Sequence, residues 1–515
     1  MRELHNEIVP KLSTAMVKLG LNENQWLNSL GSSTDRTHGD ITLPCHTLSK
    51  ILRKSPNDIA IAIANNLDSE LSEIAEINIV NGFLNFKAQN SWISKKISSM
   101  NSDPRLGVDL ENGKTIVIDY SSPNIAKRMH VGHLRSTVIG DALSRILSFK
   151  GHNVVGENHI GDWGTPFGML IEHFIECDNN NVGEIDLSTF YKEARYKFEN
   201  IDDFALRSRQ RVVKLQSRDA ETIDLWKKLV DFSLVNFNSV YQMLGVLLND
   251  DNLAGESIYE DLLPEVVKRL ESQDLIVESE GALVVFPDGW YNRENEPLPL
   301  IIRKGDGGYN YATTDLACII NRVESIECNE MLYVVGAEQS QHFSMIFQVA
   351  KDAKFMDEKI KAVHVSFGLV MGSDGKKLAS REGKAITLEE LLEESVNRAE
   401  KLILEKNSSM SDSDRKKVSK MIGIGAIKYA DLSIDRNKNY VFDWDKMLSF
   451  DGNTAPYLQY AHARICSIFR KSSISRESTF NSEILVVNDF EKSLSKSIIG
   501  FSESIDETIN SYSPH

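Results

Sequence analysis

A short apolar run that leads directly into a helix constrains the fold of this chain more than any other feature. Residues 114–122 read KTIVIDYSS, as a strand buried on both faces does. Residues 121–143 read SSPNIAKRMHVGHLRSTVIGDAL, in which a Pro-Asn turn precedes a helical pattern. Strand and helix signals keep alternating through residues 151–164, 331–353 and 361–375. This alternation predicts an α/β fold with a doubly wound parallel sheet, whose ligands bind at the carboxyl ends of the strands.

The length of the chain predicts more than one domain, because 515 residues exceed what a single core accommodates. Residues 1–105 combine helix signals with two short strands joined by an Asn-Gly turn, which predicts a small α/β domain. Residues 106–410 form the expected Rossmann-type domain, with a helical insertion at about 185–295. Helical periodicity in residues 411–515 predicts an all-α C-terminal domain.

The composition is that of an ordinary globular protein, with 41% hydrophobic and 26% charged residues. No apolar run is long enough to cross a bilayer, and residues 1–20 lack the apolar core of a signal peptide. We therefore expect a cytoplasmic protein with no membrane partner. The five cysteines form no C-x-x-C pair, which argues against a zinc ribbon or a disulfide framework and favours reduced thiols.

A formal net charge of −16 provides no general attraction to nucleic acid, although a local basic surface can still bind RNA. The candidate surface lies in the predicted helical insertion. Its eight cations are Lys192, Arg195, Lys197, Arg207, Arg209, Arg211, Lys214 and Arg218. Acidic residues are interleaved with them, so a solvated helical face is the alternative interpretation.

Two histidines, His130 and His133, stand three residues apart at the start of the predicted helix. Residues at this spacing face the same way, and at a helix start they lie beside free backbone N–H groups and the positive end of the dipole. Their imidazoles could therefore bind phosphate oxygens, while Gly132 lets a flat base approach the backbone. A solvated helix end is the alternative, and a metal pair lacks a third ligand at suitable spacing.

A second cluster of cations occupies a Gly-rich segment after a predicted strand, residues 372–384, GSDGKKLASREGK. Lys376, Lys377, Arg381 and Lys384 could neutralise charge that develops on a phosphate during displacement. Alone, the segment fits a solvated surface loop. Its place on the same predicted sheet as the two histidines favours a phosphate-clamping loop.

Five hydrogen-bond acceptors are expected around one crevice of the sheet. Tyr311 and Asp315 stand four residues apart on a predicted helix and share a face, although such pairs are also common on plain surfaces. Asp119, Asn124 and Gln339 lie near the expected ends of strands. Such a set suits a substrate rich in donors, and a guanidinium has five N–H donors and a fixed positive charge.

Together these motifs resemble those of the class I arginyl-tRNA synthetases, over nearly the whole chain. The ATP-binding signature of that family resembles SSPNIAKRMHVGHLRST, and the neighbouring loop resembles ENHIGDWGTPFGMLIEH. Further hallmarks are LPLIIRKGDGGYNYATTDLA, YVVGAEQSQHF and FDWDKMLSFDGNTAPYLQYAHARI. Residues 1–95 resemble the family's N-terminal domain, which contacts the outer corner of the tRNA, and the C-terminal helices resemble its anticodon-binding domain.

The resemblance implies an arginine–tRNA ligase that acts in protein biosynthesis. Arginine and ATP, with Mg²⁺, would give arginyl-adenylate and pyrophosphate. The 3′-terminal adenosine of arginine tRNA would then accept the arginyl group. The implied partners are therefore L-arginine, ATP and arginine tRNA, and we expect a monomer without a structural metal.

Roles for single residues also follow from the resemblance. The implied catalytic residues are His130, His133, Lys127 and Lys377. ATP would be bound by Gly132, His130, His133, Lys376, Lys377, Ser380 and Arg381. Arginine would be held by Asp119, Asn124, Tyr311, Asp315 and Gln339, with the carboxylates recognising its guanidinium.

Three features depart from the family pattern. The loop reads KKLASREGK instead of K-M-S-K-S, a degeneracy that many arginine enzymes share. Arg128 stands where the family often has an acidic residue, and a cation so close to the histidines could tune ATP binding. The family's C-terminal domain normally continues for several more helices beyond the equivalent of residue 515, so we expect an incomplete helical domain here.

Other functions stay open at this point. One is an arginine-activating paralogue that serves a specialised pathway outside translation, and another is a non-catalytic tRNA-binding relative. The retained histidines and guanidinium-binding set argue against the second, because a pseudo-enzyme has no physical need for them. A small nucleotidyltransferase with an H-x-G-H motif would need neither the Tyr-Asp cluster nor the flanking domains.

Overall fold

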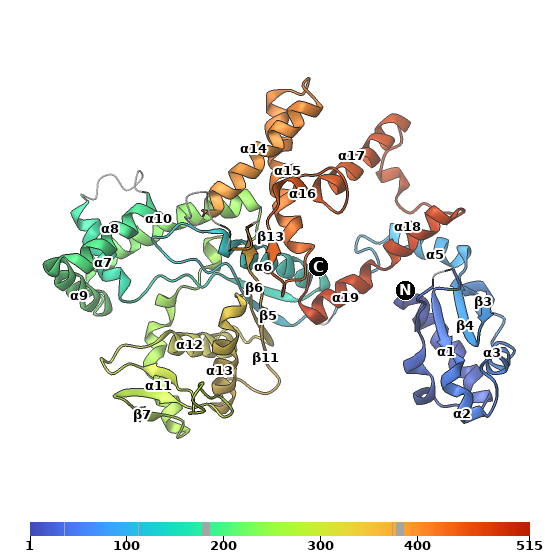
Figure 1. Cartoon of the computed structure of the whole chain (residues 1–515), viewed down its shortest axis with the longest axis horizontal. Helices are drawn as coiled ribbons and strands as arrows, with labels where there is room; N and C mark the ends of the chain where they lie inside the picture. Colours follow the sequence, from blue (N-terminus) through green and yellow to red (C-terminus); the bar gives the residue numbers. More distant parts are fainter. Residues whose placement is uncertain (36, 112, 178–185, 373, 377, 379–385) are drawn as a thin grey trace. The chain divides into compact units, whose positions relative to one another are not determined.

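The chain folds into two compact units, which Figure 1 colours along the sequence. The computed structural model describes residues 1–35, 37–111, 113–177, 186–372, 374–376, 378 and 386–515. The first unit comprises residues 1–110 and 465–511. The second comprises residues 111–464 and 512–515.

A four-stranded antiparallel sheet, in the order β1-β2-β4-β3, forms the centre of the first unit. Its strands are β1 (Gly31–Ser32), β2 (Ile41–Pro44), β3 (Ala75–Val80) and β4 (Phe83–Ala88). Asn81 and Gly82 join β3 to β4 with φ angles of 50° and 78°, as a two-residue hairpin turn requires. The hairpin predicted from the Asn-Gly pair is therefore confirmed.

The helices of this unit come from both ends of the chain. They are α1 (Arg2–Lys18), α2 (Ser49–Leu52), α3 (Pro56–Ala64), α4 (Leu71–Ile74), α5 (Asn90–Asn101), α18 (Asp489–Ile499) and α19 (Phe501–Ser511). Short 3₁₀ turns lie at Glu23–Gln25, Leu27–Ser29, Cys45–Leu48 and Glu477–Thr479. Helix α18 packs against α5, and Val486 and Ile499 enter the same core as Leu4 and Phe86. Residues more than 380 positions apart thus build one hydrophobic core.

A four-stranded parallel sheet in the order β11-β10-β5-β6 forms the centre of the second unit. Its strands are β5 (Thr115–Asp119), β6 (Asn153–Glu157), β10 (Glu330–Tyr333) and β11 (Lys361–His364). The chain adds β6 on one side of β5 and later adds β10 and β11 on the other side. The predicted doubly wound parallel sheet is therefore confirmed, and its ligand crevice is expected where β5 and β10 end.

Helices make up most of the rest of this unit. They are α6 (Val131–Lys150), α7 (Pro166–Glu176), α8 (Leu187–Asn200), α9 (Asp202–Gln216), α10 (Ala220–Leu244), α11 (Leu263–Ser272), α12 (Tyr311–Glu324), α13 (Ser340–Asp352), α14 (Leu388–Lys406), α15 (Asp412–Leu432), α16 (Trp444–Met447) and α17 (Ala455–Ser472), within which the limit between the units falls. Short 3₁₀ turns lie at Asp250–Asn252, Glu256–Leu262 and Ala337–Gln339. Within the described parts of the chain, no helix combines the length and the apolar character needed to span a membrane.

Two strands of a three-stranded antiparallel sheet lie in the segment expected as a helical insertion, about 185–295, and the third follows it. The sheet consists of β7 (Val277–Ser279), β8 (Ala282–Val285) and β9 (Leu300–Arg303). Glu280 and Gly281 turn the chain between β7 and β8 with φ angles of 51° and 78°. The strands are three and four residues long, too short to show a period-2 pattern. A two-residue parallel ladder joins β12 (Val370–Met371) to β13 (Tyr440–Val441).

Candidate active site

A strained turn connects the central strand β5 to helix α6. Ser121 and Ser122 have φ angles of 74° and 50°, which residues with a side chain seldom adopt. The backbone N–H of Ser121 donates to Oγ of Ser136 (2.9 Å), and that of Ser122 donates to Oδ1 of Asn158 (3.0 Å). These bonds stabilise the strained backbone conformation of the turn. The turn places the start of α6 at the carboxyl end of β5.

The two histidines cap the start of α6 reciprocally. Nδ1 of His130 accepts a hydrogen bond from the backbone N–H of Gly132 (3.0 Å). Nδ1 of His133 accepts one from the backbone N–H of His130 (3.1 Å), and the ring centroids lie 4.1 Å apart. A Cβ atom on Gly132 would lie 2.6 Å from the His130 ring, so glycine makes this packing possible.

The capping bonds decide which ring nitrogens can bind a ligand. Because Nδ1 of each ring accepts from the backbone, a proton on the neutral imidazole resides on Nε2. Burial, and then the charge of His130, lower the pKa of His133 to about 3. His133 is therefore a neutral hydrogen-bond donor at physiological pH, rather than an imidazolium.

A cavity of about 430 Å³ lies between the carboxyl ends of β5 and β10, beside the start of α6. Its lining includes His130, Gly132 and His133. Residues 334–336 and 367–370 form another part of the wall. The cavity combines polar groups at a helix start with apolar residues such as Phe367 and Leu369, and its volume is within the range of small-molecule sites.

The structure describes two of the lysines predicted to bind phosphate, Lys127 and Lys376. Lys127 is exposed, with its ammonium nitrogen 4.4 Å from the centroid of the Tyr191 ring. Lys376 is also exposed, and its backbone N–H donates to Oδ1 of Asp374 (3.1 Å). Among the described residues that line the cavity, neither lysine is included. Lys377, Ser380 and Arg381, and Lys384 with them, lie outside the described residues.

The residues that follow the Gly-rich segment form backbone hydrogen bonds beside the two histidines. The backbone N–H of Leu388 donates to the carbonyl oxygen of Met129 (2.8 Å), and that of Val131 donates to Ile386 (3.3 Å). Leu378, on the other side of the residues outside the description, lines the cavity. Both flanks of the segment therefore lie next to the start of α6.

Arg128 has two carboxylates nearby. Its Nε lies 3.0 Å from Oδ1 of Asp186, and its Nη1 lies 3.9 Å from Oε2 of Glu389. These ion pairs balance the positive charge of Arg128. A direct effect of Arg128 on ATP binding stays a prediction.

Asp119 already binds a guanidinium of this chain. Nη2 of the buried Arg322 lies 2.7 Å from Oδ2 of Asp119 and 2.7 Å from a carboxylate oxygen of Glu157. The hydroxyl of Ser122 donates to the other oxygen, Oδ1 of Asp119 (3.0 Å). Both carboxylate oxygens of Asp119 thus already have a partner within the chain.

Tyr311 and Asp315 come together through a residue that the sequence did not single out, His342. Nε2 of His342 lies 2.6 Å from Oδ2 of Asp315, and the Tyr311 ring stands edge-on to the imidazole with centroids 5.4 Å apart. Tyr311 itself is exposed. The shared face predicted for Tyr311 and Asp315 therefore exists, with His342 from α13 between them.

Asn124 and Gln339 are exposed at the ends of their loops. Asn124 lies over Gly161, where an added Cβ would come within 2.3 Å of Oδ1 of Asn124. Gln339 ends the 3₁₀ turn that precedes α13. The contacts of the described residues link neither side chain to Asp315, so a shared arginine site for all five acceptors stays a prediction.

Two titratable residues near Asp315 were not predicted from the sequence as site residues. His159 is half-buried, with Nδ1 3.7 Å from the sulfur of Cys318. Burial lowers the pKa of His159, but its interactions with Cys318, Asp119 and Asp315 outweigh the effect of burial and raise the pKa. Burial, with the charges of Asp162 and Asp315, raises the pKa of Glu256 to about 7. His159 follows strand β6 and could have been found from that position, whereas nothing around Glu256 marks it.

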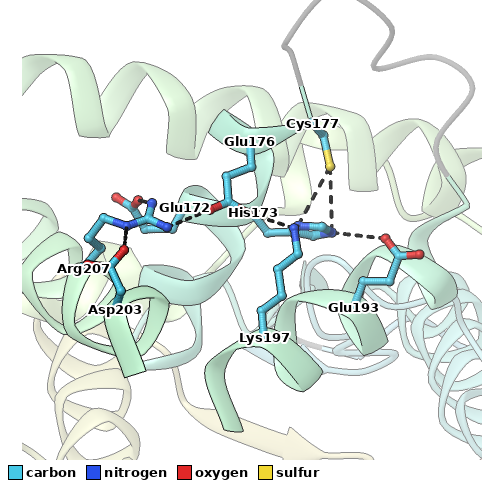
Figure 2. A network of polar contacts seen from close by, with 8 residues as sticks. All are labelled: Glu172, His173, Glu176, Cys177, Glu193, Lys197, Asp203 and Arg207. Atoms are coloured by element: carbon cyan, nitrogen blue, oxygen red, sulfur yellow. Dashed lines mark hydrogen bonds and ion pairs between the residues drawn. The ribbon is translucent and has the colours of Figure 1, made fainter. Parts of the chain in front are cut away.

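The cations of the helical insertion are largely paired with carboxylates. Figure 2 shows Arg207 between Glu172, Glu176 and Asp203, with Lys197 beside His173 and Glu176. Further pairs join Arg195 to Glu199, Arg211 to Glu172, and Arg218 to Asp261. The interleaved acidic residues thus neutralise much of the basic surface, and a tRNA contact here stays a prediction.

Three family models match the chain, and together they cover most of it. The first, "tRNA synthetases class I (R), catalytic domain", matches residues 96–444, which contain the parallel sheet and the histidine pair. The fold is therefore that of a class I aminoacyl-tRNA synthetase. The "Arginyl tRNA synthetase N terminal domain" matches residues 3–88, and the "DALR anticodon binding domain" matches residues 458–515. The chain belongs to the arginyl-tRNA synthetase family.

Individual relatives agree with this membership. The arginine–tRNA ligase of Thermobifida fusca is 46% identical over 473 residues, which are 91% of this chain and 82% of the relative. That of Yersinia pseudotuberculosis is 43% identical over the same shares. The crystal structure of Plasmodium falciparum arginyl-tRNA synthetase has a TM-score of 0.78 at 28% identity, covering 98% of this chain and 88% of that one. The Thermus thermophilus enzyme shares the fold, with a TM-score of 0.75 at 21% identity over 99% and 88% of the two chains.

Proposed function

We propose that the protein activates L-arginine with ATP and transfers the arginyl group to the 3′-terminal adenosine of arginine tRNA. The observation that carries this proposal is the cavity at the switch point of the sheet, lined by the His130–His133 pair at the start of α6. Membership of the arginyl-tRNA synthetase family supports the choice of arginine.

In the first step, a carboxylate oxygen of arginine attacks the α-phosphorus of ATP. A new O–P bond forms, the bond between the α-phosphorus and the bridging oxygen breaks, and pyrophosphate leaves with the electron pair. The Nε2–H groups of His130 and His133 are suited to donate to phosphate oxygens as charge develops on them. Preorganised donors of this kind contribute most to such displacements.

Positive charge near the phosphates would come from Lys127 and from the 372–384 segment, including Lys376 and Lys377. Aminoacyl-tRNA synthetases use ATP, generally with Mg²⁺. Within the described residues no three His, Cys, Asp or Glu side chains gather as a metal site. Mg²⁺ is usually bound by substrate phosphates with one or two carboxylates, so we infer that it enters with ATP.

Asp315 is the proposed anionic partner of the guanidinium, with Tyr311 beside it and Asn124 and Gln339 toward the other end of arginine. In the second step, a ribose hydroxyl of the terminal adenosine attacks the activated carbonyl carbon, and AMP leaves. Residues 3–88 and 458–515 would contact the tRNA, as their family models suggest. We expect a cytoplasmic monomer.

The test measures arginine-dependent exchange of pyrophosphate into ATP, with and without arginine tRNA, and the charging of that tRNA. The proposal expects both reactions with arginine and neither with lysine. Exchange without any charging would support an arginine-activating paralogue instead. Failure of both, in a chain that still binds tRNA, would identify a non-catalytic relative.

A further inference from the structure

Asp315 and His342 form a close pair whose function the proposed reaction leaves unexplained. Nε2 of His342 lies 2.6 Å from Oδ2 of Asp315, and the two side chains expose only 17% and 18% of their surface. Asp315 lies near the start of α12 and His342 near the start of α13, so the contact joins two helices. An ionised carboxylate only accepts hydrogen bonds, so Nε2 of His342 carries the proton in this bond.

The surroundings restrict the orientation of both groups. The imidazole of His342 stands edge-on to the rings of Tyr311 and Phe343, with centroids 5.4 Å and 5.5 Å away. These contacts limit rotation of the imidazole, and its hydrogen bond limits rotation of the Asp315 carboxylate. A carboxylate already fixed in place loses less conformational freedom when it binds a ligand.

The bond from His342 leaves acceptor capacity on Asp315. A carboxylate has about four acceptor positions, and His342 occupies one of them on Oδ2. Asp119 provides the contrast, since Arg322 and Ser122 engage its two oxygens. Of these two carboxylates, Asp315 is thus the better placed to accept the planar fork of an incoming guanidinium.

We propose that His342 is a positioning residue that holds the carboxylate of Asp315 in the orientation that selects the guanidinium of arginine. The inference rests on the proposed function, because His342 matters only if Asp315 binds arginine. His342 acts through Asp315, and its own contact with the substrate is not required. Replacing it should therefore weaken arginine binding specifically and leave ATP binding and the chemical step nearly unchanged.

The experiment compares three substitutions of His342 that differ in where they place a donor. The amide nitrogen of His342→Gln reaches about as far as Nε2, whereas that of His342→Asn reaches only about as far as Nδ1. His342→Ala removes the donor. Steady-state pyrophosphate exchange, with tRNA present, gives kcat and the KM values for arginine and ATP for each variant. Circular dichroism and thermal unfolding show whether each variant is folded.

We expect His342→Ala and His342→Asn to raise the KM for arginine about 10-fold or more, the size expected when a hydrogen bond to a charged group is lost. We expect kcat and the KM for ATP to stay within about 3-fold, and His342→Gln to restore the arginine KM to about 3-fold of the original. An unchanged arginine KM in His342→Asn, or a Gln variant as impaired as the Asn variant, would overturn the proposal.

Two further variants separate this inference from the proposed function. Asp315→Asn should abolish arginine activation, and normal activation by that variant would refute the guanidinium site itself, whatever His342 does. His173→Gln is the matched control, because His173 also pairs with a carboxylate, that of Glu193 at 3.4 Å, but lies on α7, whereas Asp315 and His342 lie on α12 and α13. It should leave the KM for arginine unchanged.

Discussion

The state of His133 is set by its local environment. Its Nδ1 accepts from the backbone, and burial together with His130 lowers its pKa, so it stays a neutral donor. We predict that His133→Ala lowers kcat for pyrophosphate exchange about 100-fold or more, the loss seen when one preorganised donor to a developing charge is removed. The KM for arginine should change by less than about 3-fold. A large rise in that KM, with kcat intact, would contradict the assigned role.

The same residue predicts a dependence of stability on pH. The pKa of His133 is about 3 in the folded chain against 6.5 for an ordinary histidine. Between these values the unfolded chain binds the proton more readily, so stability falls as the pH drops below 6.5. We expect the urea midpoint to fall less between pH 7 and pH 5 in His133→Asn, which keeps an acceptor for the His130 N–H. Parallel falls in both proteins would contradict this prediction.

At the residue scale, spacing along the sequence predicts how neighbouring side chains are oriented better than it predicts contacts between distant residues. The spacing of His130 and His133 was enough to predict a shared orientation at a helix start. It could not show that Asp119 is occupied by Arg322, because 203 positions separate the two residues. The sequence could not predict the pairing of Asp315 with His342 for the same reason, because α12 and α13 contact each other only in the folded protein.

Helix α6 is tied to α15 by an ion pair without solvent access. Nε of Arg135 lies 3.3 Å from Oδ1 of Asp431, and the two side chains expose 1% or less of their surface. Burial raises the pKa of Asp431 to about 6, and Arg135 opposes that rise. Nη1 of Arg135 also donates to the carbonyl oxygens of Gly368 (2.8 Å) and Lys438 (2.9 Å). The pair therefore joins the histidine helix to a wall of the cavity.

We predict that Asp431→Ala destabilises the protein by about 3–5 kcal/mol, because it leaves a buried guanidinium without a counter-charge. Urea unfolding at pH 7 measures this loss. The double variant Arg135→Met, Asp431→Leu should lose less, since the unpaired charge is gone. Equal losses in the single and double variants would show that packing, and not charge, dominates.

At the element scale, long helices and buried parallel strands were predictable because their patterns repeat over many residues. The strands β5, β6, β10 and β11 were found as apolar runs before helical segments. The hairpin β7–β8 was not predicted, because three or four residues carry too little pattern. Most ion pairs in Figure 2 join different helices, so the sequence shows them only as interleaved charges; the pair of Arg207 with Asp203, four residues apart on α9, is the exception.

The first unit joins residues from both ends of the chain in one core. Ile499 is 3% exposed and packs in the cluster that contains Leu4 and Phe86. Lys496 pairs with Asp40 at 2.5 Å, and Oγ of Ser94 accepts from the backbone N–H of Val486 (2.8 Å). Sequence patterns predicted the helices and strands of the two segments separately. They could not predict the shared core, because its residues lie nearly 400 positions apart.

We predict that Ile499→Ala destabilises the first unit by about 2–5 kcal/mol, the usual cost of a cavity in a core. Hydrogen exchange should show reduced protection in strands β2 and β4 as well as in α18, because the three share one core. Exposed Ile498→Ala, one position away, is the control and should change little. Loss of protection confined to α18 would mean that the helix is merely attached to an independent domain.

The shared core also determines when this unit can finish folding on the ribosome. About 355 residues separate its two segments, residues 1–110 and 465–511. If synthesis proceeds at roughly 5–20 residues per second, roughly 20–70 s pass between the synthesis of the N-terminal sheet and that of the helices that complete its core. During that interval the surface that later receives Val486 and Ile499 is open. The apolar surface of the N-terminal segment is therefore exposed throughout this interval in the nascent chain. A chaperone would have the most time to bind at that segment.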